Sequence, residues 1–264
     1  MAAGLHDERS GSGPDVVLVH GALGDYRQWD AIASTLAPRF RVHAVSRRHH
    51  WPGPMPAVDA PYSYEGHRED LVAFLSAIDR PVHLVGHSYG AGVVLMAALH
   101  SPERLRSLTI IEPALGSLLP DVVHGLDEER ADRAAGLAHV RALAEAGQDA
   151  AAAELFTDWI QGGPGGFAKL PDHVQAALIQ NARTILPMMA APQPDVAPAH
   201  LRTLGVRTLV VNGEHTRLWY RLIGAAAASL IPGACTETLP GCAHMTIVED
   251  PARMAALLER FLDS

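Results

Sequence analysis

The sequence predicts an α/β protein with a doubly wound, mostly parallel sheet and a helical insertion. Short apolar runs alternate with amphipathic helical segments along most of the 264 residues, which is typical of parallel strands joined by crossover helices. One apolar run, residues 82–85, leads through a short turn into an apolar helix that begins near Tyr89. The alternation stops after Pro113 and resumes at 206, and the residues between are rich in alanine. These observations favour one α/β domain interrupted by a block of helices.

The core elements follow from local patterns taken in chain order. Residues 1–14 are polar and rich in glycine and serine, so we expect a loose lead-in there. The expected strands are apolar runs bounded by turn residues, at 15–19, 41–45, 82–85, 105–111, 206–211 and 234–239. The expected helices carry apolar residues at helical spacing, at 26–36, 65–78, 89–100, 218–230 and 251–261. Residues 47–64 are rich in proline and are expected to form a loop.

The alanine-rich block after Pro113 is expected to be helical. Breaks at glycine and proline separate three helices, at about 127–146, 148–161 and 172–189. We interpret the block as a lid over the carboxyl ends of the strands, where doubly wound sheets bind their ligands. The expected domains are therefore an α/β core at 1–113 and 201–264 and a helical lid at 114–200.

Composition excludes several classes of protein. A net charge of −8 and a pI near 6.0 argue against a nucleic-acid partner. The sequence has no run of 18 apolar residues, so we expect no membrane span, and its first residues lack a signal-peptide core. Two cysteines, Cys235 and Cys242, are too few for a disulfide framework, which favours a cytoplasmic location. The sequence does not decide between a monomer and a homodimer.

The turn before the apolar helix carries the strongest functional signal. Residues 86–90 read Gly-His-Ser-Tyr-Gly and fit the G-x-S-x-G nucleophile elbow. A serine on so sharp a turn is strained, and glycines two residues away on either side let the strand and helix backbones approach. The turn would present Ser88 at a helix N-terminus, where the N–H of Tyr89 favours a developing oxyanion. A chance turn of small residues is the alternative, and the flanking strand and helix argue against it.

The elbow, the His20-Gly21 turn, the position of the insertion and the late His244 together resemble the α/β-hydrolase fold superfamily over nearly the whole chain from residue 15 to 262. In that family the nucleophile, acid and base follow in the order Ser, Asp or Glu, His. The resemblance implies that His244, in the loop after the last strand, is the base for Ser88. It also implies an oxyanion hole of the backbone N–H groups of Tyr89 and Ala22, with Leu23 as a possible substitute for Ala22. The lead-in is too short for the family's initial two-stranded hairpin, so one or both of those strands are expected to be missing.

The acid departs from the commonest family pattern. Thr216 stands in the turn where relatives usually carry an aspartate. Glu112, which ends the strand after the elbow strand, resembles the acid of many haloalkane dehalogenases and of zearalenone-type lactonases. Glu214 lies in the expected turn, two residues early. We favour Glu112, because a charge directly after a buried strand is costly unless it has a partner. Glu214 remains the alternative acid, and a cap or salt bridge to the lid remains an alternative role for Glu112.

These residues predict a cofactor-free serine hydrolase that cleaves a carboxylic ester or lactone of a small to medium, apolar molecule. A serine nucleophile argues against dehalogenase or epoxide hydrolase chemistry, which uses an aspartate. No dinucleotide fingerprint or phosphate loop is present, and the histidines show no zinc spacing. Leu23, Trp159 and Met188 are candidate substrate-binding residues. The alternatives are a C–C bond or amide hydrolase with the same three residues, or a non-catalytic small-molecule receptor.

Overall fold

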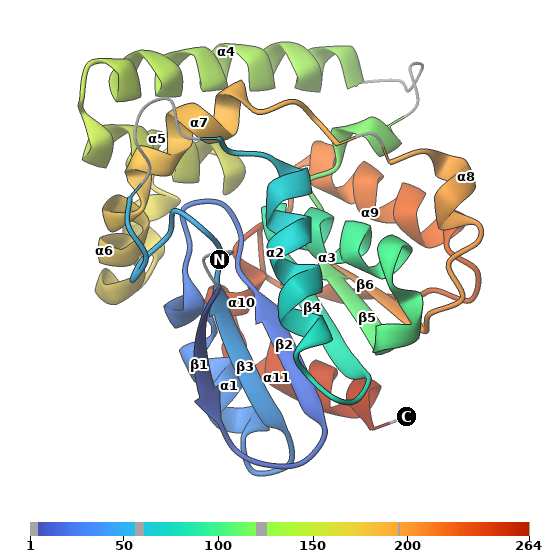
Figure 1. Cartoon of the computed structure of the whole chain (residues 1–264). Helices are drawn as coiled ribbons and strands as arrows, with labels where there is room; N and C mark the ends of the chain where they lie inside the picture. The colour runs from blue at the N-terminus through green and yellow to red at the C-terminus, as the bar shows by residue number, and fades with distance from the viewer. Residues whose placement is uncertain (1–4, 56–60, 120–125, 195, 264) are drawn as a thin grey trace.

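A sheet of seven strands forms the centre of the computed structural model, which describes residues 5–55, 61–119, 126–194 and 196–263 (Figure 1). The strand order is β1-β3-β2-β4-β5-β6-β7, with β1 antiparallel to β3 and every other pair parallel. The strands are β1 (His6–Ser10), β2 (Asp15–Val19), β3 (Arg41–Ser46), β4 (Val82–His87), β5 (Leu105–Ile111), β6 (Thr208–Gly213) and β7 (Cys235–Leu239). The mostly parallel, doubly wound sheet predicted from the sequence is therefore confirmed.

The first strand corrects the prediction of a loose lead-in. Residues His6–Ser10 pair along their length with β3, so the lead-in supplies one strand of the family's initial hairpin, of which one or both strands were expected to be missing. The pairing is reinforced by buried His43, whose Nδ1 lies 3.1 Å from a carboxylate oxygen of Asp7 and whose Nε2 lies 3.0 Å from Asp15. The segment looked like a linker because an edge strand with a half-exposed, polar sequence lacks the apolar signal of a central strand.

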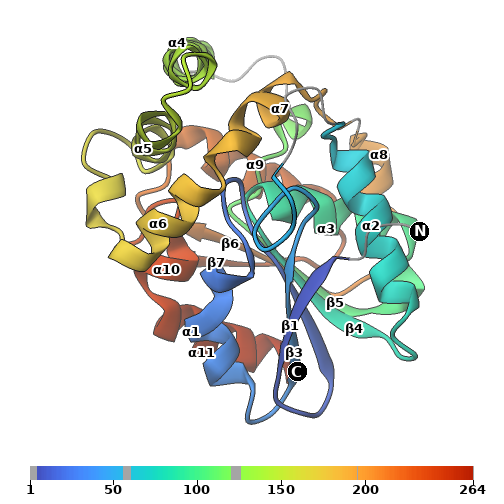
Figure 2. The ribbon, with the colours of Figure 1, turned by 60° about the vertical axis from the view of Figure 1, so that its left-hand side comes forward.

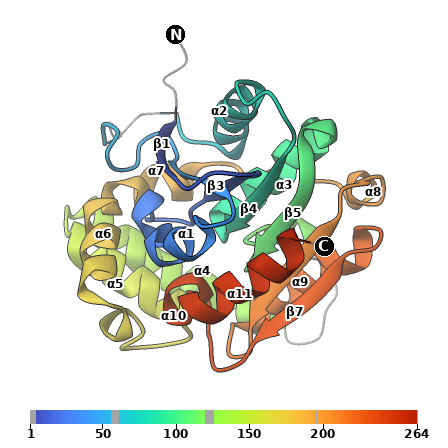
Figure 3. The same cartoon turned by 90° about the horizontal axis from the view of Figure 1, so that it is seen from below.

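Helices cover both faces of the sheet, as the alternation of strand residues requires. Val17 and Val19 face a buried cluster with helices α2 (Tyr64–Ser76), α3 (Tyr89–His100) and α9 (Leu218–Leu230). Val16 and Leu18 face the opposite cluster, with α1 (Asp30–Leu36) and α11 (Pro251–Leu262). Figure 3 shows α1 and α11 side by side on that second face. The short helices α8 (Pro198–Leu201) and α10 (Thr246–Glu249) were not predicted.

The residues between β5 and β6 are helical, as expected, and contribute α4 (Leu126–Glu145), α5 (Asp149–Ile160), α6 (Asp172–Gln180) and α7 (Ile185–Ala190). Figures 1 and 2 show α4, α5 and α7 gathered at one end of the sheet. The third predicted helix breaks between α6 and α7. Asn181, fully buried at the break, donates to Asp25 at 2.8 Å and accepts from the Trp51 N–H at 2.9 Å. Its side chain therefore ties the break to two loops of the core.

These helices pack on loops that follow the strands. Leu23 and Met245, which come after β2 and β7, belong to one buried cluster with Phe156 and Ile185 of α5 and α7. Parts of the expected loop and insertion, residues 56–60, 120–125 and 195, lie outside the described residues. In the part of the chain that is described, no helix combines the length and apolar character needed to cross a membrane.

Candidate active site

Ser88 occupies the strained turn predicted from the sequence. It lies between β4 and α3 with φ 54° and ψ −116°, a backbone conformation that residues other than glycine rarely adopt. Its N–H donates to the carbonyl of Ile111 at 2.8 Å. A Cβ on Gly90 would lie 2.4 Å from the His20 carbonyl oxygen, and a Cβ on Gly86 would lie 2.5 Å from the Gly90 carbonyl oxygen. Both glycines are therefore required by close backbone approach.

Three predicted residues form one hydrogen-bonded relay. His244 Nε2 lies 2.9 Å from Ser88 Oγ, and His244 Nδ1 lies 3.0 Å from Glu112 Oε2. The exposed fractions of Ser88, His244 and Glu112 are 6%, 0% and 0%. With Nδ1–H donating to the carboxylate, Nε2 is left as the acceptor for the serine hydroxyl. This tautomer is the one that can remove a proton from Ser88.

The carboxylate of Glu112 has two further donors. Its Oε1 accepts from the Gly213 N–H at 2.5 Å, and its Oε2 accepts from the Thr216 hydroxyl at 2.6 Å. Glu112 has a φ of 52°, so the chain turns sharply as it leaves β5. The carboxylate is thereby directed across to the end of β6, where the later turn supplies the donors.

Glu214 lies apart from this relay. Its side chain is 54% exposed and accepts from the Gly241 N–H at 2.8 Å. Of the two carboxylates considered from the sequence, the structure brings Glu112 to His244 and holds Glu214 in a solvated turn.

Burial shifts the ionisation of the relay. It raises the pKa of Glu112 to about 7, although the hydrogen bonds from Thr216 and Gly213 oppose the shift. Burial also lowers the pKa of His244 well below its ordinary value of 6.5. Both shifts disfavour the charged form of the group concerned. The imidazole is consequently held neutral at neutral pH, as a proton acceptor must be.

Two further side chains hold His244 in place: His87, which was interpreted from the sequence as a packing residue, and Tyr220, which was not predicted. The Nε2–H of His87 donates to the carbonyl of His244 at 2.9 Å, so His87 anchors the base loop as well as packing in the elbow. The ring of Tyr220 lies over the imidazole, with the ring centroids 3.9 Å apart. A tyrosine near the start of α9 has no sequence signature for this role, because the contact depends on how α9 meets the loop after β7.

The His20-Gly21 turn passes beside the serine, as predicted. A Cβ on Gly21 would lie 3.1 Å from Ser88 Cβ. The carbonyl of Gly21 accepts from Arg47 Nη2 at 2.9 Å and from His20 Nδ1 at 2.9 Å. His20 Nε2 accepts from the Arg47 N–H at 3.0 Å, which assigns the proton of the imidazole to Nδ1. The trans peptide between Gly21 and Ala22 therefore has its oxygen fixed, and its N–H points away from Arg47.

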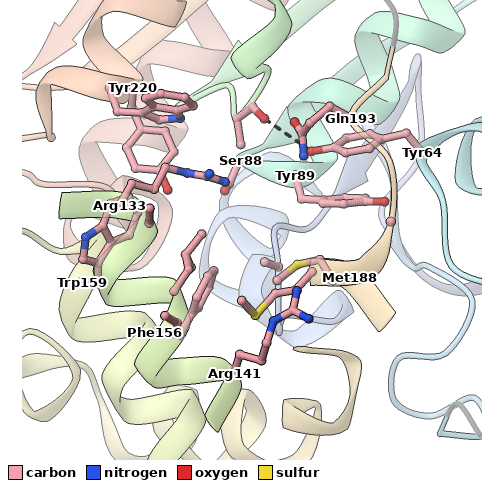
Figure 4. Close-up of a pocket in the computed structure, with 18 of the residues that line it drawn as sticks. Tyr64, Ser88, Tyr89, Arg133, Arg141, Phe156, Trp159, Met188, Gln193 and Tyr220 are labelled. Carbon is pink, nitrogen blue, oxygen red and sulfur yellow. Dashed lines mark hydrogen bonds between the residues drawn. The ribbon is translucent and has the colours of Figure 1, made fainter. Parts of the chain in front are cut away.

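A cavity of about 540 Å³ opens at Ser88 (Figure 4). Ala22 and Tyr89, the predicted oxyanion residues, line it together with the predicted substrate residues Trp159 and Met188. The other lining residues are Tyr64, Ala114, Arg133, Ala134, Leu137, Ala138, Arg141, Ala142, Glu145, Phe156, Met189, Ala191, Gln193, Trp219 and Tyr220. Leu23 is different: it is fully buried under the helices and is not among these lining residues, so the structure does not bring it to the cavity.

The adjacent histidines His49 and His50 are occupied by other contacts. His50 is fully buried, with Nδ1 2.7 Å from the Gly24 carbonyl and Nε2 3.1 Å from the Tyr62 hydroxyl. His49 Nε2 lies 3.3 Å from the Pro61 carbonyl. Among the residues that the structure describes, no three His, Cys, Asp or Glu side chains gather as ligands for a metal ion.

Comparison with known proteins gives matches to a family model, to curated relatives and to solved structures. A model of the Alpha/beta hydrolase family matches residues 16–257. A pimeloyl-[acyl-carrier protein] methyl ester esterase of Methylococcus capsulatus is 39% identical over 108 residues, which are 41% of this chain and 40% of that protein. The chain thus matches about two fifths of the length of this curated relative.

Solved structures match over nearly the whole chain. An alpha/beta hydrolase from Sphaerobacter thermophilus has 28% sequence identity and a TM-score of 0.71, covering 98% of this chain and 96% of that one. The carboxylesterase CesB of Bacillus subtilis has 21% identity and a TM-score of 0.77, covering 98% of this chain and 87% of that one. At this identity the second likeness shows a shared fold.

Proposed function

The chain belongs to the alpha/beta hydrolase family, and from this premise we propose that it is a cofactor-free serine hydrolase that cleaves a carboxylic ester or lactone of a small to medium, largely apolar molecule. One observation carries the proposal. Ser88, His244 and Glu112 are joined by hydrogen bonds of 2.9 and 3.0 Å, in the order that nucleophilic catalysis by serine requires.

Acylation begins with the neutral imidazole. As Ser88 Oγ attacks the substrate carbonyl carbon, His244 Nε2 takes the hydroxyl proton and becomes an imidazolium. Glu112 stabilises that cation through Nδ1–H and keeps the ring in the productive tautomer. The tetrahedral intermediate then collapses when His244 returns its proton to the leaving alcohol oxygen. The product of this half-reaction is an acyl-enzyme on Ser88.

The developing oxyanion is held by backbone donors. The proposed donors are the N–H groups of Tyr89 and Ala22, which are favoured because both residues line the cavity beside Ser88. Tyr89 is the first residue of α3, so its N–H has no partner within the helix and the helix dipole favours negative charge there. Water activated by His244 then attacks the acyl carbon, the acid leaves, and Ser88 recovers its proton.

The substrate class follows from the cavity. Its lining is dominated by alanines with Leu137, Phe156, Trp159 and the methionines 188 and 189, which suits an apolar acyl or ring group. The name of the Methylococcus capsulatus relative, a methyl ester esterase, favours an ester over an amide. We also propose that the helices between β5 and β6 act as a lid, because α4, α5 and α7 supply much of that lining.

The test is a panel of p-nitrophenyl esters, lactones and amides assayed with the wild type and Ser88→Ala. Loss of the nucleophile should reduce ester turnover by about 10⁴-fold or more, because the members of such a triad act as a unit. Ser76→Ala, which removes an exposed hydroxyl from α2, is the matched control and should leave turnover unchanged. An active-site fluorophosphonate should label the wild type and not Ser88→Ala.

The outcomes separate the alternatives. If the protein hydrolyses only amides or C–C bonds, the substrate assignment changes from an ester to that bond, while the proposed catalytic residues stay the same. Stoichiometric labelling of Ser88 without turnover of any compound would favour a small-molecule receptor. A Ser88→Ala protein that keeps more than a few per cent of the activity would remove the serine mechanism.

A further inference from the structure

Two arginines of α4 bring positive charge into the otherwise mostly apolar cavity. Arg133 and Arg141 both line it, and Figure 4 shows their side chains directed inward from the helix. They lie eight residues apart, roughly 12 Å along the helix axis, with Leu137 between them on the same face. Arg133 is half-buried and Arg141 is exposed, so the first sits deeper in the cavity and the second nearer its mouth.

The acids of the same helix do not neutralise Arg133. Arg217 forms an ion pair with Glu129 at 2.8 Å and a second with Asp132. These two carboxylates precede Arg133 on the same helix by four residues and by one, and both are directed to Arg217 instead. In the described part of the chain, no carboxylate oxygen lies within 4.0 Å of either cavity arginine. Glu145 also lines the cavity, one turn beyond Arg141, and it is exposed and forms no such ion pair.

Arg133 is instead held against an aromatic face. Its guanidinium carbon lies 4.9 Å from the ring centroid of Trp219, a cavity residue on α9. This contact orients the side chain across the cavity, and no hydrogen-bond acceptor among the described residues occupies the guanidinium N–H groups, which can therefore bind a ligand. Among the described residues this arginine fork has no carboxylate partner, and in a mostly apolar lining it suits the bidentate binding of an anionic group. The chain as a whole carries a net charge of −8, so the positive charge of this lining does not follow from the overall charge of the chain.

We propose that the cavity selects an ester whose acyl chain ends in a second, free carboxylate, as in the half-ester of a dicarboxylic acid. The distal carboxylate binds Arg133, and Arg141 attracts it at the mouth. The apolar lining accommodates the methylene chain between the two ends, while Ser88 attacks the ester carbonyl. This inference rests on the proposed serine esterase function and names its substrate class.

The experiment compares two esters that differ only at the distal end. Monomethyl suberate carries a carboxylate where methyl octanoate carries a methyl group, and kcat/KM is measured for both with the wild type, Arg133→Gln and Arg141→Gln. The wild type should prefer monomethyl suberate by about tenfold or more, and Arg133→Gln should reduce that ratio by about tenfold or more. Arg141→Gln should reduce it less. High salt should lower the ratio of the two kcat/KM values, because it screens the positive charge of Arg141 at the mouth of the cavity.

The control is Arg130→Gln, which removes the same charge from the same helix at a site outside the cavity lining. Arg130 Nη1 lies 3.8 Å from Asp127 Oδ1, and Arg130 is not among the residues that line the cavity. Its loss should therefore leave kcat/KM for both esters unchanged. If Arg133→Gln fails to fold, inhibition of the wild type still decides: suberate should inhibit hydrolysis of methyl octanoate more strongly than octanoate does. Equal inhibition, or a ratio near one in the wild type, overturns the inference while the esterase stands. If the wild type hydrolyses neither ester and also does not react with a fluorophosphonate, both the proposed function and this inference are overturned.

Discussion

Thr216 donates a hydrogen bond of 2.6 Å to Glu112 Oε2, the same oxygen that lies 3.0 Å from His244 Nδ1. The turn after β6, where the resemblance led us to expect an aspartate, thus supplies a donor to a carboxylate from the neighbouring strand. The exchange is chemically coherent, because a threonine hydroxyl can satisfy the buried carboxylate but cannot itself stabilise an imidazolium.

The assignment of the acid is tested by a matched pair of substitutions. Glu112→Gln should cut kcat by about 10⁴-fold, because an amide at this position no longer stabilises the imidazolium and permits the wrong tautomer of His244. Glu214→Gln removes the same charge from a half-exposed side chain and should change kcat by less than about tenfold. Steady-state kinetics on one p-nitrophenyl ester measure both. The reverse order of effects would move the acid to Glu214.

The hydroxyl of Thr216 should affect the pH at which activity is lost. Burial raises the pKa of Glu112 to about 7 while the Thr216 hydrogen bond opposes the rise. Thr216→Val removes that donor at nearly constant volume, so the pKa of Glu112 should rise further and the carboxylate should protonate at higher pH. The acid limb of kcat/KM should therefore move to higher pH, with a loss of roughly tenfold at neutral pH that shrinks in alkali. If the acid limb of the pH profile of kcat/KM is unchanged in Thr216→Val, ionisation of Glu112 does not control that limb.

The sequence predicts the sheet well because its central strands are continuous apolar runs. The helix at 89–100 and the strand at 105–111 have the same bounds in the structure. The edge strand His6–Ser10 was not predicted, because its half-exposed, polar sequence lacks the apolar signal of a central strand and the contact of Asp7 with the buried His43 is long-range. The break at Asn181 was not predicted either, because a long-range hydrogen bond to Asp25 fixes its place. Local pattern is insufficient where a distant side chain decides the structure.

The residues of the candidate site also divide into those that a local sequence pattern identifies and those that it does not. Ser88 and His244 carry local signals, a strained turn and a loop after the last strand, and Glu112 stands out as a charge at the end of a buried strand. Tyr220 and Arg133 have no such signal: an aromatic residue and an arginine on helices are ordinary surface or packing residues until the helices are placed against the core. Their proximity to the cavity is a property of the tertiary packing.

The Asp7–His43–Asp15 cluster should make stability depend on pH. Burial opposes protonation of His43, but hydrogen bonds and charge from Asp7 and Asp15 raise its pKa above 6.5 overall. The stabilisation is therefore fully present below pH 6.5 and is lost as pH rises through the folded-state pKa. Urea unfolding between pH 6 and 9 should show stability falling with pH, with a shallower fall in Asp7→Asn.

Asp7→Asn should also lower stability at pH 6, by about 1–3 kcal/mol if the hydrogen bond to a charged imidazole is lost. Arg9 also pairs with Asp7, and Arg41 and Arg80 approach Asp15, so these charges remain in the variant. His139→Gln, an exposed change on α4, is the control and should reproduce the wild-type pH dependence. If the free energy of unfolding of Asp7→Asn depends on pH as steeply as that of the wild type, His43 is not the source of the pH dependence.

Arg47 is a buried cation placed behind the proposed oxyanion hole. It is 2% exposed, and its guanidinium donates to the Gly21 carbonyl and the Tyr62 hydroxyl, each at 2.9 Å. Its guanidinium carbon also lies 4.4 Å from the ring centroid of Tyr89. Within the described residues it forms no ion pair with a carboxylate. The charge is therefore directed at the peptide whose N–H, on Ala22, is a proposed oxyanion donor.

Arg47→Met should weaken that donor without touching Ser88. The methionine fills much of the same space but leaves the Gly21 carbonyl without its guanidinium, so the Gly21–Ala22 peptide becomes less polarised and less fixed. We expect kcat to fall by about 10- to 100-fold with little change in KM, because an oxyanion donor acts mainly in the transition state. Binding of a boronic acid, whose adduct with serine has an oxyanion-like oxygen, should weaken in parallel. Arg47→Lys, which keeps the charge, should recover part of both. Equal losses in kcat/KM for Met and Lys, accompanied by a lower midpoint of thermal unfolding in both, would assign Arg47 to stability alone.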